Sequence, residues 1–153
     1  MQVFVADERE KVIRDLKAFF EEDAERFSVD IAWLYGSWAK GFPRDDSDVD
    51  LALFFCEEMA RPEESLERIT AISVALERIL KREVNIIEIK ESFEKPMLYY
   101  NAIVHGIPVY IRRFQSYLCL RNQALFQMED FRIFGIGWQY EVAKRNLEAL
   151  RNV

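Results

Sequence analysis

The spacing of apolar and polar positions divides the chain into alternating helical and extended segments. After Asp7, where an acidic start resembles a capping box, apolar residues recur at three- and four-residue intervals and predict an amphipathic helix to about Phe27. Aromatic and β-branched residues from Ile31 to Tyr35 predict a buried strand that ends at a glycine. A second strand is predicted over residues 49–55.

The middle of the chain continues this alternation. A proline at a first helical turn, followed by apolar residues at helical spacing, predicts a helix over residues 62–80. Short β-branched runs predict strands over residues 84–89 and 107–111, with a short helix over residues 96–105 between them. This order predicts an α/β (α+β) fold: a mixed sheet of about four strands, with helices on one face and the acidic residues Asp48 and Asp50 open on the other.

The last part of the chain is helical in pattern over residues 115–152. A Gly135-Ile136-Gly137 triplet interrupts the pattern. The sequence is therefore compatible with two separate helices and with one kinked helix. We expect this part to pack alongside the sheet, and it can also leave an apolar face for a partner subunit. Without a repeat or a linker, the 153 residues predict a single domain with a core of about residues 1–111.

Composition narrows the classes of function. Half of the residues are hydrophobic, which argues for a folded core. The net charge is −6 and no basic stripe is present, so a nucleic-acid partner is not expected. No apolar run reaches the roughly 18 residues of a membrane span, and we expect a cytoplasmic protein without membrane contact. Cys56 and Cys119 lack the spacing of a zinc site or a disulfide framework.

Two acidic residues supply the candidate metal site. Asp48 and Asp50 are two positions apart at the second predicted strand, so that both carboxylates project from the same face. Two hard oxygen ligands without a His or Cys close to them in sequence are typical of a Mg²⁺ (or Mn²⁺) site. Like charges this close repel and raise each other's pKa, and a bound divalent cation relieves the repulsion.

Gly36 and Ser37 supply the candidate phosphate site. They lie where a strand gives way to a turn, before a short helical stretch that Gly41 can close, and such turns point backbone N–H groups at anions. Gly36 permits a phosphate to approach the main chain, Ser37 adds a hydroxyl donor, and Lys40 adds positive charge. Phosphate held there can bridge to a metal held by the acidic pair, as phosphoryl transfer requires.

These residues form a signature with fixed spacing. Gly36-Ser37, ten further residues, and Asp48-x-Asp50 resemble the signature of the nucleotidyltransferase superfamily related to DNA polymerase β. The inner pattern is similar to that of the minimal nucleotidyltransferases, with Lys40 where arginine is usual and Ser47 beside the acidic pair. The element order and the segment from Val104 to Tyr110 extend the resemblance to about residue 111.

The resemblance implies a function and a partner. It implies Mg²⁺-dependent transfer of AMP from ATP to a hydroxyl, with Asp48 and Asp50 as catalytic metal ligands and Gly36, Ser37, Lys40 and Ser47 as nucleotide-binding residues. Minimal nucleotidyltransferases often act as antitoxins that modify a tyrosine of a small all-α HEPN-type toxin, and such a protein is the implied partner. An aminoglycoside-type small-molecule acceptor is an alternative, and the association of several copies of this chain is also open.

Asn85 is the main departure from the family pattern. The family usually supplies a third carboxylate from a neighbouring strand, and here Asn85 occupies that place. An amide carries no charge and is a poor base and a weaker Mg²⁺ ligand. Glu88 is the alternative candidate, although on a regular strand it faces the opposite side. Both an active enzyme and an inactive module that masks a partner therefore remain open.

Two further residues have alternative interpretations. Trp38 follows the phosphate turn and either stacks on a nucleobase or covers the edge of the sheet. His105 is the single histidine, and its place just before Gly106 favours helix capping over catalysis.

Overall fold

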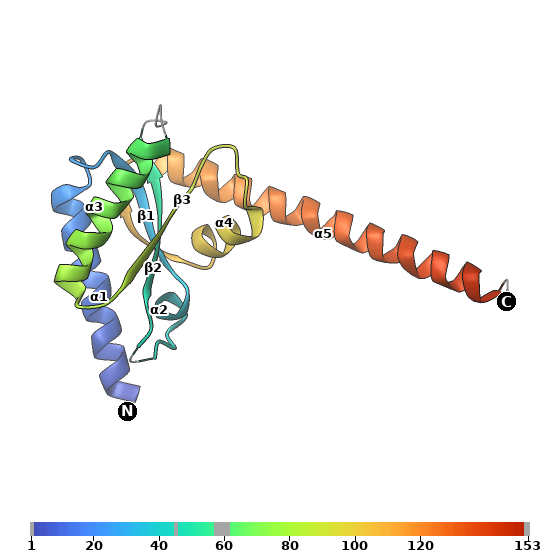
Figure 1. Cartoon of the computed structure of the whole chain (residues 1–153), viewed down its shortest axis with the longest axis horizontal. Coiled ribbons are helices and arrows are strands. Elements are labelled where there is room, and N and C mark those ends of the chain that lie inside the picture. The colour runs from blue at the N-terminus through green and yellow to red at the C-terminus, as the bar shows by residue number, and fades with distance from the viewer. Residues whose placement is uncertain (1, 45, 57–61, 152–153) are drawn as a thin grey trace.

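The computed structural model describes residues 2–44, 46–56 and 62–151 (Figure 1). In this part of the chain the elements follow in the order α1 (Gln2–Asp23), β1 (Val29–Tyr35), α2 (Ser37–Lys40), β2 (Val49–Phe55), α3 (Pro62–Leu80), β3 (Val84–Glu88), α4 (Pro96–Ile103), β4 (Ile107–Ile111) and α5 (Phe114–Arg151). The predicted order is confirmed. Helix α1 begins upstream of the start predicted at Asp7, because the exposed Asp7 and Glu8 lie within the helix and do not cap it.

The strands of the described residues form one mixed sheet in the order β3-β2-β1-β4. Strand β1 is antiparallel to both β2 and β4, whereas β2 and β3 are parallel. The parallel pair is joined by a crossover that contains α3, as parallel neighbours require. The predicted mixed sheet of four strands is confirmed.

Helices cover both faces of the sheet, which differs from the expectation that one face is open. Leu16 and Phe20 of α1 and Leu76 of α3 pack with the strands in one core, on the first face. Ile103 of α4 and Leu120 of α5 belong to a second core on the other face. The reason is that β1 is apolar on both sides, with its first six residues buried, so that neither face can be left to solvent.

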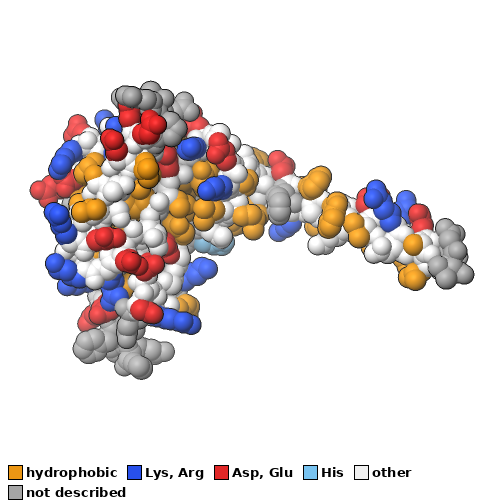
Figure 2. All heavy atoms as spheres, in the orientation of Figure 1, with side chains coloured by type: hydrophobic (Ala, Val, Ile, Leu, Met, Phe, Trp, Pro, Cys, Tyr) orange, Lys and Arg blue, Asp and Glu red, His pale blue; other side chains and the backbone are white. Residues whose placement is uncertain are grey.

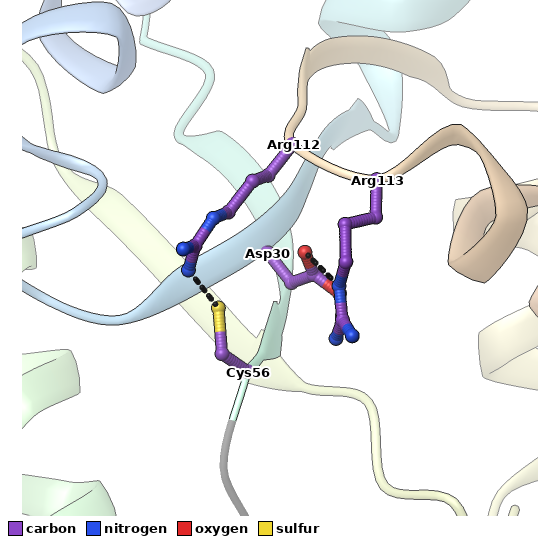
Figure 3. A network of polar contacts seen from close by, with 4 residues as sticks. All are labelled: Asp30, Cys56, Arg112 and Arg113. Atoms are coloured by element: carbon purple, nitrogen blue, oxygen red, sulfur yellow. Dashed lines mark hydrogen bonds and ion pairs between the residues drawn. The ribbon is translucent and has the colours of Figure 1, made fainter.

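An ion pair between a buried carboxylate and a half-exposed arginine joins the start of α5 to β1 (Figure 3). The Asp30 carboxylate is fully buried and accepts hydrogen bonds from Nε and Nη2 of Arg113, the shortest at 2.8 Å. The neighbouring Arg112 donates from Nη1 to the Cys56 sulfur at 3.1 Å. Because an unpaired buried carboxylate is costly, Arg113 keeps the first turn of α5 beside β1.

Helix α5 is one continuous helix, so the predicted interruption is wrong. Gly135 and Gly137 lack the positive φ of a helix-ending glycine and continue the helix. Only its first turns pack alongside the domain, through the buried Leu120 and Ala124, and the rest projects away from the sheet (Figure 1). Apolar side chains such as Trp138 are exposed along this arm (Figure 2). Within the described residues no helix, α5 included, is apolar enough over a sufficient length to cross a membrane.

Candidate functional site

The turn after β1 has the conformation that its glycines favour. Gly36 has φ of +74° and precedes the four-residue helix α2, and Gly41 ends that helix in the left-handed region, with φ of +82°. The Lys40 N–H donates to the Gly36 carbonyl at 3.1 Å and closes the turn. The short helix and its Gly41 end are as the sequence predicts.

Position 36 requires a glycine for two reasons, its positive φ and its close contact with Asp50. A Cβ atom added to Gly36 would overlap the Asp50 carboxylate. The contact follows from the sheet, because Asp50 on β2 is the register partner of Tyr35, the residue before Gly36. The turn after β1 and Asp50 of the acidic pair therefore lie in direct contact, at a position where only glycine leaves enough space.

Asp48 and Asp50 share the side of the sheet on which Asn85 lies. Asn85 is the register partner of Asp50 on the parallel strand β3, and its Nδ2 donates to Asp48 Oδ2 at 3.1 Å. The intervening Val49 and the following Leu51 are fully buried in the opposite core. The amide thus stands where the third carboxylate is expected, between the two acids.

Burial and like charge perturb the groups around Asp50. Partial burial raises the pKa of Asp50, the hydrogen bond from Asn85 opposes this, and the charge of Asp48 raises the pKa further. Burial, together with the charge of Asp50, raises the pKa of Tyr35 to about 12. A cation bound beside Asp50 would stabilise its partly buried charge and reduce its repulsion with Asp48.

Glu88 faces away from the acidic pair. Its register partner Leu53 belongs to the core beneath α1 and α3, and its Oε2 accepts a hydrogen bond from Ser65 of α3. Within the described residues, no group of three or more His, Cys, Asp or Glu side chains is placed to hold a metal ion. The acidic pair is therefore completed by an amide and not by a third carboxylate.

Ser47 and Trp38 shape the loop between α2 and β2. The Ser47 hydroxyl accepts a hydrogen bond from the Arg44 N–H at 2.7 Å, and its carbonyl accepts one from Trp38 Nε1 at 3.2 Å. Trp38 is buried in the core of α1 and α3, so it covers the sheet and does not stack on a base. The Arg82 guanidinium lies over its ring, 4.8 Å from the centroid.

Arg9 of α1 binds the short helix α2 after β1, a role that the sequence does not predict. Its Nε donates to the Trp38 carbonyl and its Nη2 to the Ala39 carbonyl, both at 2.8 Å. These carbonyls lie near the end of α2, where helix carbonyls have no partner within the helix. No local sequence signal could indicate Arg9, since its partners lie about 30 residues away.

A cavity of about 200 Å³ opens beside the turn. It is lined by Tyr35, Gly36, Ala39, Lys40, Leu98, Asn101 and His105. The residue after His105 must be glycine, because a Cβ at Gly106 would overlap the carbonyl of Ala102 and crowd that of Leu34. The exposed Lys40 and His105, 65 residues apart in the chain, line this one cavity beside the contact between Gly36 and Asp50, a proximity that the sequence does not predict.

The comparisons with known proteins identify the family. The family described as "Polymerase beta, Nucleotidyltransferase" matches residues 14–115, which are 102 of the 153 residues. The chain belongs to this nucleotidyltransferase family. The matched range contains Gly36, Ser37, the acidic pair and Asn85, and it ends at the start of α5. No curated protein matches the sequence significantly.

Several solved structures share the fold. A toxin–antitoxin crystal structure with AMP-PNP has a TM-score of 0.63 and 12% identity, covering 82% of this chain and 97% of that one. A tri-AMPylated Shewanella oneidensis HEPN toxin in complex with an MNT antitoxin has a TM-score of 0.53 and 13% identity, covering 93% and 98%. The toxin–antitoxin pair MntA-HepT has a TM-score of 0.55 and 12% identity, covering 88% and 96%. At these identities the likeness shows the fold alone.

We expect Gly36→Ala to destabilise the protein by about 1–3 kcal/mol, because the substitution strains a positive φ and displaces the Asp50 carboxylate. Urea unfolding followed by circular dichroism measures the change. Gly135→Ala is the matched control. It adds the same methyl to a helical glycine with open space around it, and should stabilise the protein by about 0.5–1 kcal/mol. Equal effects of the two substitutions would contradict the assignment.

Because the pKa of Asp50 is raised, its negative charge lowers the stability of the folded protein, and the size of this effect depends on pH. The folded state binds the Asp50 proton more tightly than the unfolded state, so stability falls as the pH rises from the unfolded pKa through the folded one. Without divalent cations, Asp50→Asn should therefore stabilise the protein at pH 7, and the gain should disappear near pH 3. Urea unfolding across this range tests this expectation, and Asp46→Asn, at an exposed acid before β2, is the control that should give no comparable gain in stability at pH 7.

Proposed function

We propose that this chain transfers a nucleoside monophosphate, AMP from ATP, to a hydroxyl acceptor. The acceptor oxygen bonds to the α-phosphorus, the bond to the bridging oxygen of the β-phosphate breaks, and pyrophosphate leaves while the hydroxyl proton passes to a base or to water. The observation that carries this proposal is the direct contact between the Gly36 turn and the Asp50 carboxylate. It joins a phosphate-binding position to a cation-binding position within one site.

The donor set fits a hard divalent cation. Asp48 and Asp50 offer carboxylate oxygens, and the pKa of Asp50 is raised by burial first and by the charge of Asp48 second, both of which a bound cation would offset. Bound Mg²⁺ (or Mn²⁺) would neutralise triphosphate charge and polarise the reacting phosphate. Gly36 and Ser37 would hold the triphosphate. The positive charge of Lys40, which lines the cavity, would partly neutralise the negative charge of the triphosphate. Ser47 would support the loop, since its hydroxyl and carbonyl are both engaged there.

We propose a tyrosine of a HEPN-type toxin as the acceptor, which makes this chain an antitoxin of the cytoplasm. The support is the fold, which this chain shares with an MNT antitoxin in complex with a tri-AMPylated HEPN toxin. A small-molecule acceptor of the aminoglycoside type is the alternative that the same chemistry permits.

A second candidate function is a binding module that masks its partner without turnover. Asn85 favours it, because an amide between the two acids cannot take the proton of an attacking hydroxyl as a carboxylate does. Glu88 is hydrogen-bonded to Ser65 on the other side of the sheet and does not compensate. The two candidates share nucleotide and partner binding and differ only in turnover.

Incubation with ATP labelled at the α-phosphate separates the two candidates. With Mg²⁺ and a HEPN-type toxin encoded beside this chain, we expect label on the toxin, and we expect its loss in Asp48→Ala/Asp50→Ala. The control is Asp46→Ala, which removes an exposed acid from the same loop and should retain transfer. Toxin binding without any label, in the parent chain as well as in the double variant, would leave only the binding module.

Asn85→Asp tests whether the position of the third carboxylate is intact. Without divalent cations we expect a lower melting temperature, because three carboxylates then meet at one end of the sheet. With Mg²⁺ we expect a larger rise in melting temperature than in the parent chain, and faster transfer to the acceptor. Glu88→Gln is the comparison, and it should change neither the rise in melting temperature with Mg²⁺ nor the rate of transfer. An effect of Glu88→Gln as large as that of Asn85→Asp would assign the third position to Glu88.

A further inference from the structure

The projecting part of α5 carries a heptad pattern of apolar residues over residues 126–150, about 36 Å of helix. We call these eight positions the α5 seam. The first positions of the heptads are Phe126, Ile133, Tyr140 and Leu147, and the fourth positions are Glu129, Ile136, Ala143 and Leu150. Glu129 is the one charged residue among the eight. This spacing is typical of a helix that pairs with another helix along its length.

The seam lies on the side of α5 that the domain does not use. Leu120 and Ala124, which pack in the core with α4, occupy the second and sixth heptad positions, opposite the seam. The larger apolar seam side chains are between 62% and 74% exposed. Figure 2 shows hydrophobic side chains along the arm beyond the domain. An apolar stripe of this length is a surface for association.

The charges beside the seam favour a second copy in antiparallel orientation. When two α5 helices cross at residue 138, Phe126 lies against the partner's Leu150, and Tyr140 against the partner's Ile136. The flanking Asp130, which is exposed, then lies beside the partner's Lys144, and the symmetry of the pair forms this ion pair twice. Charge complementarity and apolar layers therefore coincide in one register.

Parallel pairing lacks these contacts. In a parallel pair with the same register, Glu129 faces the partner's Glu129 in the core of the seam, which is repulsive. The flanking positions then bring Asp130 near the partner's Leu125 and Lys144 near the partner's Gln139, so that no opposite charges meet. In the antiparallel register Glu129 lies instead against the partner's Leu147.

We propose that two copies of this chain associate through antiparallel pairing of their α5 seams. In this register the domain contacts of each copy, which begin at Ala124, lie beyond Leu150 at the end of the partner's seam. The two nucleotidyltransferase units therefore stand at opposite ends of the helix pair. The association is independent of nucleotide transfer.

Sedimentation equilibrium of the full chain between about 1 and 100 μM tests the pairing. We expect a monomer–dimer equilibrium, which Ile133→Asp weakens at least tenfold because it places two charges in the seam. Trp138→Asp is the matched control: it adds the same charge at an exposed aromatic residue off the seam, and should leave the dimer unchanged. A monomer at 100 μM, or equal loss of association in both variants, would overturn the proposal. Circular dichroism confirms that each variant is folded.

A charge exchange tests the orientation. Asp130→Lys alone and Lys144→Asp alone each replace two attractive pairs by repulsive ones, and should weaken the dimer by roughly three- to tenfold. The double variant restores opposite charges and should recover the affinity of the parent chain. Additive weakening in the double variant would exclude the antiparallel register.

Discussion

The contact between the Asp50 carboxylate and Gly36 is the constraint around which the candidate site is built. The contact exists because β1 and β2 pair with Tyr35 opposite Asp50, so that the turn after one strand meets an acid on the other. A side chain at Gly36 would occupy the space of the carboxylate, and an L-residue would resist its φ. Moving either strand by one residue would turn Asp50 to the opposite face and separate the two halves of the site.

The elements around this contact are fastened by polar groups that come from distant parts of the chain. Arg9 binds two carbonyls of the turn helix α2, Trp38 Nε1 reaches the Ser47 carbonyl, and Asn85 reaches Asp48. The acceptor in each of these hydrogen bonds is a backbone carbonyl or a carboxylate, which needs a donor where water does not reach it. The turn and the start of β2 are therefore held in place before any ligand binds, which reduces the ordering cost of binding.

Asn85 has opposite effects on the stability of the acidic pair and on the chemistry that a third carboxylate there would support. Its amide relieves part of the repulsion between Asp48 and Asp50, as its opposing effect on the pKa of Asp50 shows. A third carboxylate there would add charge and require a cation for stability. The amide thus lets the acidic pair persist without a cation, but it supplies neither the charge nor the basicity of a carboxylate. Asn85 therefore reduces the repulsion between the two carboxylates in the metal-free protein, while the site lacks the base that a third carboxylate would provide.

The sequence by itself determined the element order, the mixed four-stranded sheet and the spacing of Gly36-Ser37 and Asp48-x-Asp50, because these depend on local periodicity and on short, fixed separations. The tertiary structure decided what depends on distant packing. Arg9 and the cavity residues Lys40 and His105 act across 29 or more positions, and two-sided burial of β1 placed α4 over the face expected to be open. The continuity of α5 through Gly135 and Gly137 was also decided there, since helical glycines lower stability only slightly and local pattern cannot distinguish a kink from a helix that continues.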